Sequence, residues 1–90
     1  MAGWLAKIDV MLKPTVNDPP GLAIRDALRQ LGFGGVQSTR AGKHFEVALE
    51  AADRSAAEET VKTMCEKLLA NPVVEQFEFE VMPATIPTTR

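Results

Sequence analysis

The connection that fixes the order of structural elements in this chain reads Lys13-Pro14-Thr15-Val16-Asn17-Asp18-Pro19-Pro20-Gly21. Each of its prolines holds φ at about −65° and removes a backbone donor, so the connection is rigid. Asp18 followed by Pro19 is typical of a helix N-cap with proline at the first helical position. The stretch therefore predicts a stiff link between a strand that ends before it and a helix that begins within it.

The residues on either side of this connection support that prediction. Apolar and charged residues alternate from Ala6 to Lys13, which is the period of a half-buried strand. A helix is expected from Pro19 to Leu31, because Ile24, Ala27, Leu28 and Leu31 share one helical face. Gly32 is then expected to end this helix in the left-handed conformation.

The rest of the chain predicts three more strands and one more helix. A short strand is expected over Val36 to Arg40, turning at Ala41-Gly42-Lys43 into a strand that buries Phe45, Val47 and Leu49 and exposes His44, Glu46, Ala48 and Glu50. Ser55 and Glu58 match a capping box that would start the second helix. Its expected buried residues are Ala57, Val61, Met64, Cys65, Leu68 and Leu69, and Asn71-Pro72 ends it. A last strand buries Phe77, Phe79 and Val81.

The expected order is therefore β-α-β-β-α-β. Strands with one polar and one apolar face indicate an antiparallel sheet with two helices on one face, an α+β fold that is ferredoxin-like or a close variant. Residues 1–82 form one domain in this interpretation. Residues 83–90, rich in proline and threonine, are expected to be a disordered tail. This fold hosts enzymes, regulators and binding modules, so it does not decide the function.

Composition narrows the function classes. The net charge of −2 provides no field that would attract nucleic acid or anionic lipid, and the open strand faces carry glutamates rather than the aromatics of an RNA-binding sheet. Apolar runs are far shorter than the roughly 20 residues that cross a membrane. Cys65 is the single cysteine, which fits a reducing cytoplasm. A chain of 90 residues buries a small core, so we expect a homodimer, formed through an edge strand or the polar sheet face.

Few residues are candidates for chemistry. A catalytic histidine needs a nucleophile or an orienting acid, and Glu46 shares the strand face of His44. His44 is nevertheless interpreted as an exposed strand residue beside a turn. Cys65 lies in an apolar helical stripe and is expected to be buried. One histidine and one cysteine on separate elements do not make a metal site. Gly32 to Gly35 follow a helix rather than open one, which disfavours a phosphate loop. Lys13, Arg40 and Lys43 are either solvated or in contact with an acidic partner or a phosphate.

Three segments in register resemble the PurS family, the small subunit of phosphoribosylformylglycinamidine synthase (formylglycinamide ribonucleotide amidotransferase). The segments are Val10-Met11-Leu12-Lys13-Pro14-Thr15-Val16-Asn17-Asp18-Pro19-Pro20-Gly21, Arg40-Ala41-Gly42-Lys43-His44-Phe45-Glu46 and Met64-Cys65-Glu66-Lys67-Leu68-Leu69-Ala70-Asn71-Pro72-Val73-Val74-Glu75. The resemblance covers nearly everything except the tail.

The resemblance implies a non-catalytic subunit of de novo purine biosynthesis. It would bridge, as a dimer, a glutaminase subunit and a large ATP-dependent synthetase subunit, and support ammonia transfer between them. ATP and magnesium would belong to the large subunit, and this chain would bind no cofactor and hold no catalytic residue. The resemblance also makes the proline loop and the Arg40–Lys43 turn the expected docking surfaces, with the residues Lys13, Asp18, Pro19, Gly21, Arg40, Gly42 and Lys43.

Two other function classes stay open. A regulatory module of the same fold would bind a small molecule by itself. A small enzyme such as an acylphosphatase would need an arginine in a phosphate-cradling loop after the first strand, and the loop from Pro14 to Pro20 contains none.

Overall fold

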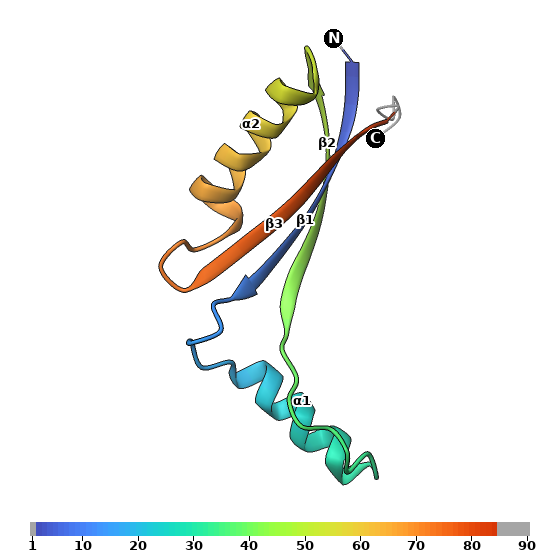
Figure 1. Cartoon of the computed structure of the whole chain (residues 1–90), viewed down its shortest axis with the longest axis vertical. Helices are drawn as coiled ribbons and strands as arrows, with labels where there is room; N and C mark the ends of the chain where they lie inside the picture. Colours follow the sequence, from blue (N-terminus) through green and yellow to red (C-terminus); the bar gives the residue numbers. More distant parts are fainter. Residues whose placement is uncertain (1, 85–90) are drawn as a thin grey trace.

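The computed structural model describes residues 2–84 and has the shape of a sheet with a helix projecting from one end (Figure 1). Its elements, in chain order, are β1 (Ala2–Leu12), α1 (Pro19–Gln30), β2 (Gly42–Ala51), α2 (Arg54–Met64), the π-helical segment η1 (Cys65–Leu69) and β3 (Glu75–Pro83). The molecule measures 51 × 29 × 21 Å. Its radius of gyration of 16.9 Å exceeds the roughly 12 Å typical of a compact domain of this length.

The sheet is antiparallel and has the strand order β2-β1-β3. The central strand β1 pairs with both neighbours along nearly its whole length, so that Ile8 lies opposite Phe45 on one side and Phe79 on the other. Ala6, Ile8 and Val10 are fully buried, whereas Asp9 between them is exposed. The same alternation holds in β2 and β3. The α+β class, the antiparallel sheet and the predicted faces of these three strands are confirmed.

The predicted strand over Val36–Arg40 is wrong, and the sheet has three strands rather than four. Residues 33–41 are irregular and run back beside α1 towards the sheet (Figure 1). A strand would pair through its backbone, but here a side chain binds the segment: Nε of Arg29 donates to the Val36 carbonyl at 2.8 Å. The expected turn at Ala41-Gly42-Lys43 is therefore not a hairpin, because β2 begins at Gly42.

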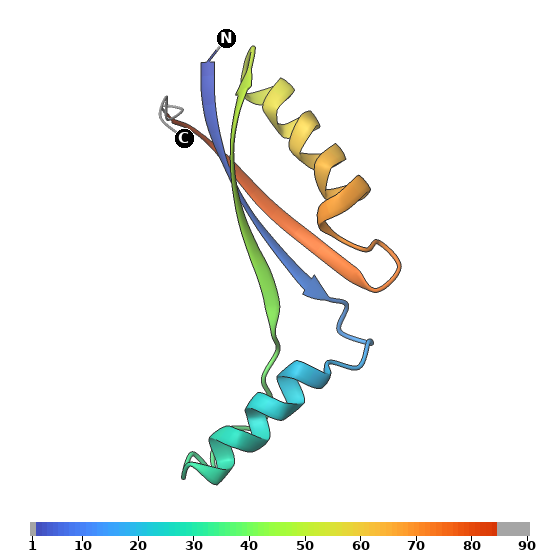
Figure 2. The same cartoon turned by 180° about the vertical axis from the view of Figure 1, so that it is seen from behind.

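Helix α1 has the predicted position in the sequence but not in space. It spans Pro19–Gln30, and Gly32 has the expected positive φ of 105°. However, α1 points away from the sheet in both views, so the prediction that two helices cover one sheet face is wrong (Figure 2). The apolar side chains Ile24 and Leu31 are 44% and 74% exposed. An apolar stripe on a helix indicates that another surface packs against it. No element within residues 2–84 covers the stripe of α1.

The core lies between the sheet and α2, which is the one α-helix that covers a sheet face among the described residues (Figure 1). Ala57, Val61 and Cys65 from the helical segment are buried against β1 and Val81 of β3. At one end of this core, Nε1 of Trp4 donates to the Ala51 carbonyl at 3.3 Å. The Arg54 guanidinium lies 5.5 Å from the centroid of the Trp4 ring and closes this end.

Helix α2 begins and ends differently from the prediction. Asp53, not Ser55, is the N-cap, and its side chain accepts a hydrogen bond from the Ala56 amide at 2.8 Å. At the other end, the amide of Ala70 donates to the carbonyl of Cys65, five residues earlier, at 3.0 Å. This π-turn delays the buried stripe by one residue, from Leu69 to Ala70. Leu68, predicted to be in the core, is consequently 82% exposed.

The end of β3 lies one residue beyond the predicted domain boundary. Pro83 belongs to the strand, and the amide of Ala84 donates to the Gly3 carbonyl at 3.0 Å. The first two residues of the expected tail therefore belong to the end of the sheet. Residues 85–90, the rest of that tail, lie outside the described residues.

Candidate partner-docking site

The segments that carry the predicted docking residues come together at the end of the sheet from which α1 projects (Figure 1). Three chain segments come together there: the proline loop, the residues that lead into β2, and the turn that leads into β3. The amide of Lys13 donates to the carbonyl of Val74 at 2.8 Å and so ties the first segment to the third. We call this region the junction; it comprises Lys13, Asp18, Pro19, Gly21, Arg40, Gly42, Lys43, Val74 and Glu75.

Asp18 holds two segments of the junction together. Its Oδ1 accepts a hydrogen bond from the amide of Gly21 at 3.0 Å, which confirms the predicted N-cap. Its Oδ2 accepts a second hydrogen bond from the amide of Ala41, also at 3.0 Å. Both bonds hold the pKa of the Asp18 carboxyl below its ordinary value, because they stabilise the charged form. The bond from the Gly21 amide has the larger effect. One carboxylate therefore joins the start of α1 to the start of β2.

Two glycines allow these segments to touch through their backbones. A Cβ atom on Gly21 would collide with the carbonyl oxygen of Thr39. A Cβ atom on Gly42 would collide with the carbonyl oxygen of Val10. Both positions thus exclude larger residues on steric grounds, which is the role of glycine at a close backbone approach.

Two basic side chains of the junction, those of Arg40 and Lys43, have partners within the chain. The Arg40 guanidinium donates to the carbonyl of Leu12. Nζ of Lys43 lies 3.4 Å from Oε2 of Glu75, whose Oε1 accepts a hydrogen bond from the Asn71 amide at 2.7 Å. The hydrogen bond from the Asn71 amide keeps the pKa of the Glu75 carboxyl below its ordinary value, and the charge of Lys43 adds a smaller effect in the same direction.

These contacts give the junction residues a structural role and leave their docking role a prediction. The Lys43 side chain is still 54% exposed, and Pro19 and Arg40 are exposed as well. A hollow of about 300 Å³ lies between Leu12, Asp18 and Lys43. The arrangement presents a rigid, nearly charge-balanced surface with no group placed for acid–base or nucleophilic chemistry.

His44 lies on the sheet face opposite α2, between two carboxylates. Its Nδ1 is 2.7 Å from Oδ1 of Asp9 on β1, and its Nε2 is 3.1 Å from Oε2 of Glu46. Both carboxylates raise the pKa of the imidazole, Asp9 more strongly, because they stabilise the protonated ring. The side chain is half exposed, which agrees with its interpretation as a surface residue of the strand.

Cys65 is buried in the core, as predicted. Burial, and to a smaller extent Glu66, raise the pKa of its thiol, so it is a poor nucleophile. Within residues 2–84, no group of three or more histidine, cysteine, aspartate or glutamate side chains has the arrangement of a metal site. Over the same residues, no helix has the length and apolar character needed to cross a membrane.

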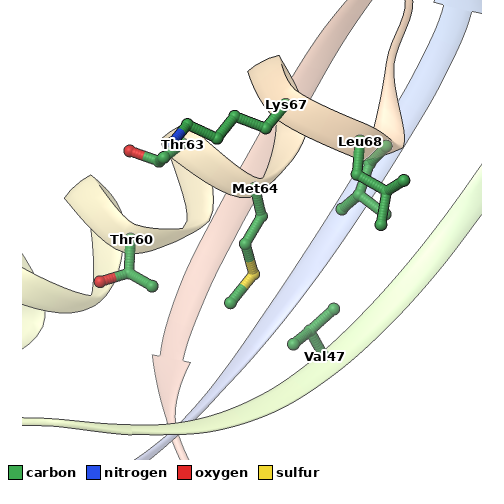
Figure 3. Close-up of a pocket in the computed structure, with 7 residues that line it drawn as sticks. Val47, Thr60, Thr63, Met64, Lys67 and Leu68 are labelled. Atoms are coloured by element: carbon green, nitrogen blue, oxygen red, sulfur yellow. The ribbon is translucent and has the colours of Figure 1, made fainter.

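The sequence did not predict a groove beside the core. About 500 Å³ of open space lies between the end of α2 and the edge strand β2, and Figure 3 shows Met64 pointing from the helix towards Val47 on the strand. Its lining is mainly apolar: Val47, Thr60, Thr63, Met64, Lys67, Leu68 and Leu69. Met64, Leu68 and Leu69 were expected in the core; Leu69 packs against it, Met64 is half-buried and Leu68 is exposed. One feature of the sequence could have indicated the groove: the apolar residues of this helix are spread over more than one stripe.

Comparison with known proteins gives a consistent family. A family model, PurS, described as phosphoribosylformylglycinamidine (FGAM) synthase, matches residues 5–83. The chain is 47% identical over 75 residues to "Phosphoribosylformylglycinamidine synthase subunit PurS" of Synechocystis, covering 83% of this chain and 75% of the relative. It is 45% identical over 78 residues to the subunit of the same name from Bacillus subtilis, covering 87% and 92% of the two chains.

Solved structures agree with the sequence relatives. A chain in the structure of PurLQS from Thermotoga maritima superposes with a TM-score of 0.84 at 38% identity, covering 91% of this chain and 100% of that one. Bacillus subtilis PurS superposes with a TM-score of 0.80 at 43% identity, covering 88% and 98%. This chain therefore shares its overall fold with these structures.

Removing the Asp18 carboxylate should destabilise the fold. Asp18→Ala loses both accepted hydrogen bonds, whereas Asp18→Asn keeps one carbonyl oxygen and can serve one of the two amides. We expect the urea midpoint, followed by circular dichroism, to fall most for Asp18→Ala and less for Asp18→Asn. Asp26→Ala is the control, because Asp26 is exposed on α1 and pairs with its neighbour Arg25.

The effect should also depend on pH. Because the pKa of Asp18 is lower in the folded chain, its contribution is present above the unfolded value of about 3.9 and is lost as pH falls through the folded value. The two Asp18 variants should therefore lose less stability on acidification than the parent chain does. Equal midpoints for Asp18→Ala and Asp26→Ala would show that the carboxylate does not hold the junction.

His44 should titrate above the ordinary histidine pKa of about 6.5, as followed by NMR of its ring protons. Asp9→Asn should lower this pKa more than Glu46→Gln does, since Asp9 is the stronger influence. The pairing stabilises the fold below the unfolded pKa, and this stabilisation is lost as pH rises through the raised folded value. A larger effect of Glu46→Gln would contradict the assignment.

Proposed function

Because the chain belongs to the PurS family, we propose that it is the small, non-catalytic subunit of phosphoribosylformylglycinamidine synthase in de novo purine biosynthesis. The observation that carries this proposal is the family match over residues 5–83, supported by the superposition on a chain of PurLQS from Thermotoga maritima. Two features of the chain suit this role: the Asp9 and Glu46 carboxylates favour the protonated ring of His44, and burial raises the pKa of the Cys65 thiol.

In this proposal the chain bridges the glutaminase and the ATP-dependent synthetase subunits and supports ammonia transfer between them. An elongated molecule of 51 Å with a rigid junction near its middle suits a connecting role, because it offers separate surfaces to separate partners. ATP and magnesium act on the large subunit in this scheme, and this chain binds no cofactor. The same proposal places the chain in the cytoplasm, where its single cysteine stays reduced.

We also propose that the chain forms a homodimer. Helix α1 presents Ile24 and Leu31 to solvent, and Phe33 just beyond it is 57% exposed. The groove beside β2 lacks a cover, and Leu68 at its mouth is almost fully exposed. A second copy can cover both of these surfaces, because its α1 can pack against apolar side chains that this chain leaves exposed. Such a two-fold arrangement uses each surface twice and closes on itself.

The dimer also explains the small core of the single chain. The largest fully buried side chains are Ile8, Val10, Val61 and Cys65, and the other buried residues include four alanines. Domains of this size gain little stability from their own core. Covering the exposed apolar side chains of α1 adds about 25 cal/mol of stabilisation for each Å² removed from water.

The proposed function predicts a defined response in a reconstituted synthase. Adding this chain to the large and glutaminase subunits should restore glutamine-dependent formation of the amidine product. Turnover driven by ammonia, measured in parallel, should change little, because external ammonia does not need the bridge. If neither rate responds, the chain is not the bridging subunit. The regulatory-module alternative would then be tested by a ligand-induced rise in melting temperature.

The docking role of the junction can be tested in the same assay. Lys43→Glu should lower the glutamine-dependent rate without lowering the ammonia-driven rate. Lys62→Glu, on the exposed side of α2, changes the charge equally and serves as the control. Equal rates for Lys43→Glu, Lys62→Glu and the parent chain would show that the junction is not a docking surface.

The homodimer is tested by the mass of the chain in solution. We expect a dimer by light scattering, and Ile24→Asp/Leu31→Asp should shift it to a monomer because two charges would enter an apolar interface. Ala23→Asp/Gln30→Asp introduces the same charges at the same spacing on exposed positions and should stay dimeric. A monomeric parent chain, or a dimer that survives Ile24→Asp/Leu31→Asp, would contradict the α1 interface.

A further inference from the structure

The sheet face opposite α2 carries a cluster of carboxylates at the middle of the sheet. In its two middle rows, Asp9 lies between His44 and Glu78, and Lys7 lies between Glu46 and Glu80. With His44 neutral, four carboxylates and one ammonium give this face a charge of −3, compared with −2 for the whole chain. We call these six residues the acidic face. The remainder of the chain is therefore slightly positive.

The acidic face is open in the single chain. Helix α2 covers the opposite face of the sheet, and no described element lies over this one (Figures 1 and 2). Asp9, Glu46, Glu78 and Glu80 are all exposed. A shallow hollow of about 280 Å³ lies among Lys7, His44 and Glu78. Leu5 and Met82 continue the same face and are only half-buried, so the surface combines charges with apolar area.

The arrangement of these charges is unfavourable for the isolated chain. Asp9 and Glu78 lie directly opposite each other on neighbouring strands, and like charges in such cross-strand positions destabilise a sheet. Lys7 is the one fixed cation among the six residues and has a carboxylate on either side. A cationic surface placed over the face would relieve the repulsion that the strands impose.

We propose that the acidic face docks a lysine- and arginine-bearing protein surface of another subunit of the synthase complex; this rests on the proposed function. Charge complementarity selects this occupant, because a net charge of −3 repels nucleic acid and anionic lipid. It also disfavours a second copy, since stacking two such faces would place carboxylates against carboxylates. The homodimer and the partner subunit therefore use different surfaces of the chain: α1 with the groove for the former, and the acidic face for the latter.

The test is a charge reversal with a matched control. Glu78→Lys/Glu80→Lys reverses two charges on the acidic face. The control, Glu59→Lys/Glu66→Lys, reverses two exposed charges on the helical segment and so changes the net charge by the same amount. Binding of each to the purified large subunit and to the purified glutaminase subunit is measured by biolayer interferometry at low and moderate salt. Circular dichroism and light scattering confirm that each variant is folded and has the parent's oligomeric state.

We expect the parent chain to bind one of the two subunits with an affinity that falls as salt rises. Glu78→Lys/Glu80→Lys should weaken this binding at least tenfold, the neutral Glu78→Gln/Glu80→Gln less, and the helix control under twofold. Equal binding by both reversed variants would overturn the inference and leave the proposed function intact. A reversal that alters the homodimer but not subunit binding would assign the face to a second copy and overturn the inference too. If the parent chain binds neither subunit, the proposed function itself fails.

Discussion

The two hydrogen bonds of the Asp18 carboxylate set the direction in which α1 leaves the sheet. One binds the amide that starts the helix, and the other binds the amide that precedes β2, so the helix and the returning chain leave the junction side by side. The backbone contact at Gly21 allows no side chain between them. Because these bonds are made at the end of the sheet, α1 extends beyond the strands rather than folding back over them. The exposed apolar stripe of α1, and with it the proposed need for a second copy, follows from this local geometry.

The sequence predicted what depends on local pattern. Strand faces with a period of two, the proline-started helix and the buried Cys65 all have signals within a few residues of one another. The failures come from choices that local pattern does not contain. The stripe through Ile24 and Leu31 shows that α1 needs an apolar cover but not whose surface provides it. Val36 to Arg40 had the composition of a strand, yet its neighbour in the fold is a helix, so it lacks a strand to pair with.

The helix α2 shows a second limit of the sequence. Asp53 and Ser55 are both good capping residues, and which one starts the helix depends on how tightly β2 turns into it. The π-helical segment from Cys65 to Leu69 ends with a hydrogen bond from the Ala70 amide to the Cys65 carbonyl, and nothing in its composition distinguishes it from an α-helical turn. This wider turn places Leu68 at the rim of the groove instead of in the core. The candidate docking residues come together at one junction in the structure, which the sequence did not predict, and their docking role stays a prediction. Their contacts within the chain could not be seen before the three segments were brought together.

The small core affects the stability of the chain when it is not assembled with a partner. Helix α2 covers only one of the two faces of the three-stranded sheet, so the core is small. The apolar surface that stabilises the fold is therefore completed by association with a partner. The apparent stability of such a chain rises with the concentration of its partners by mass action. A copy made in excess would spend more of its time open and would be removed first by proteolysis. The projecting helix would thereby act as a quality-control device that matches the abundance of this subunit to the abundance of its complex.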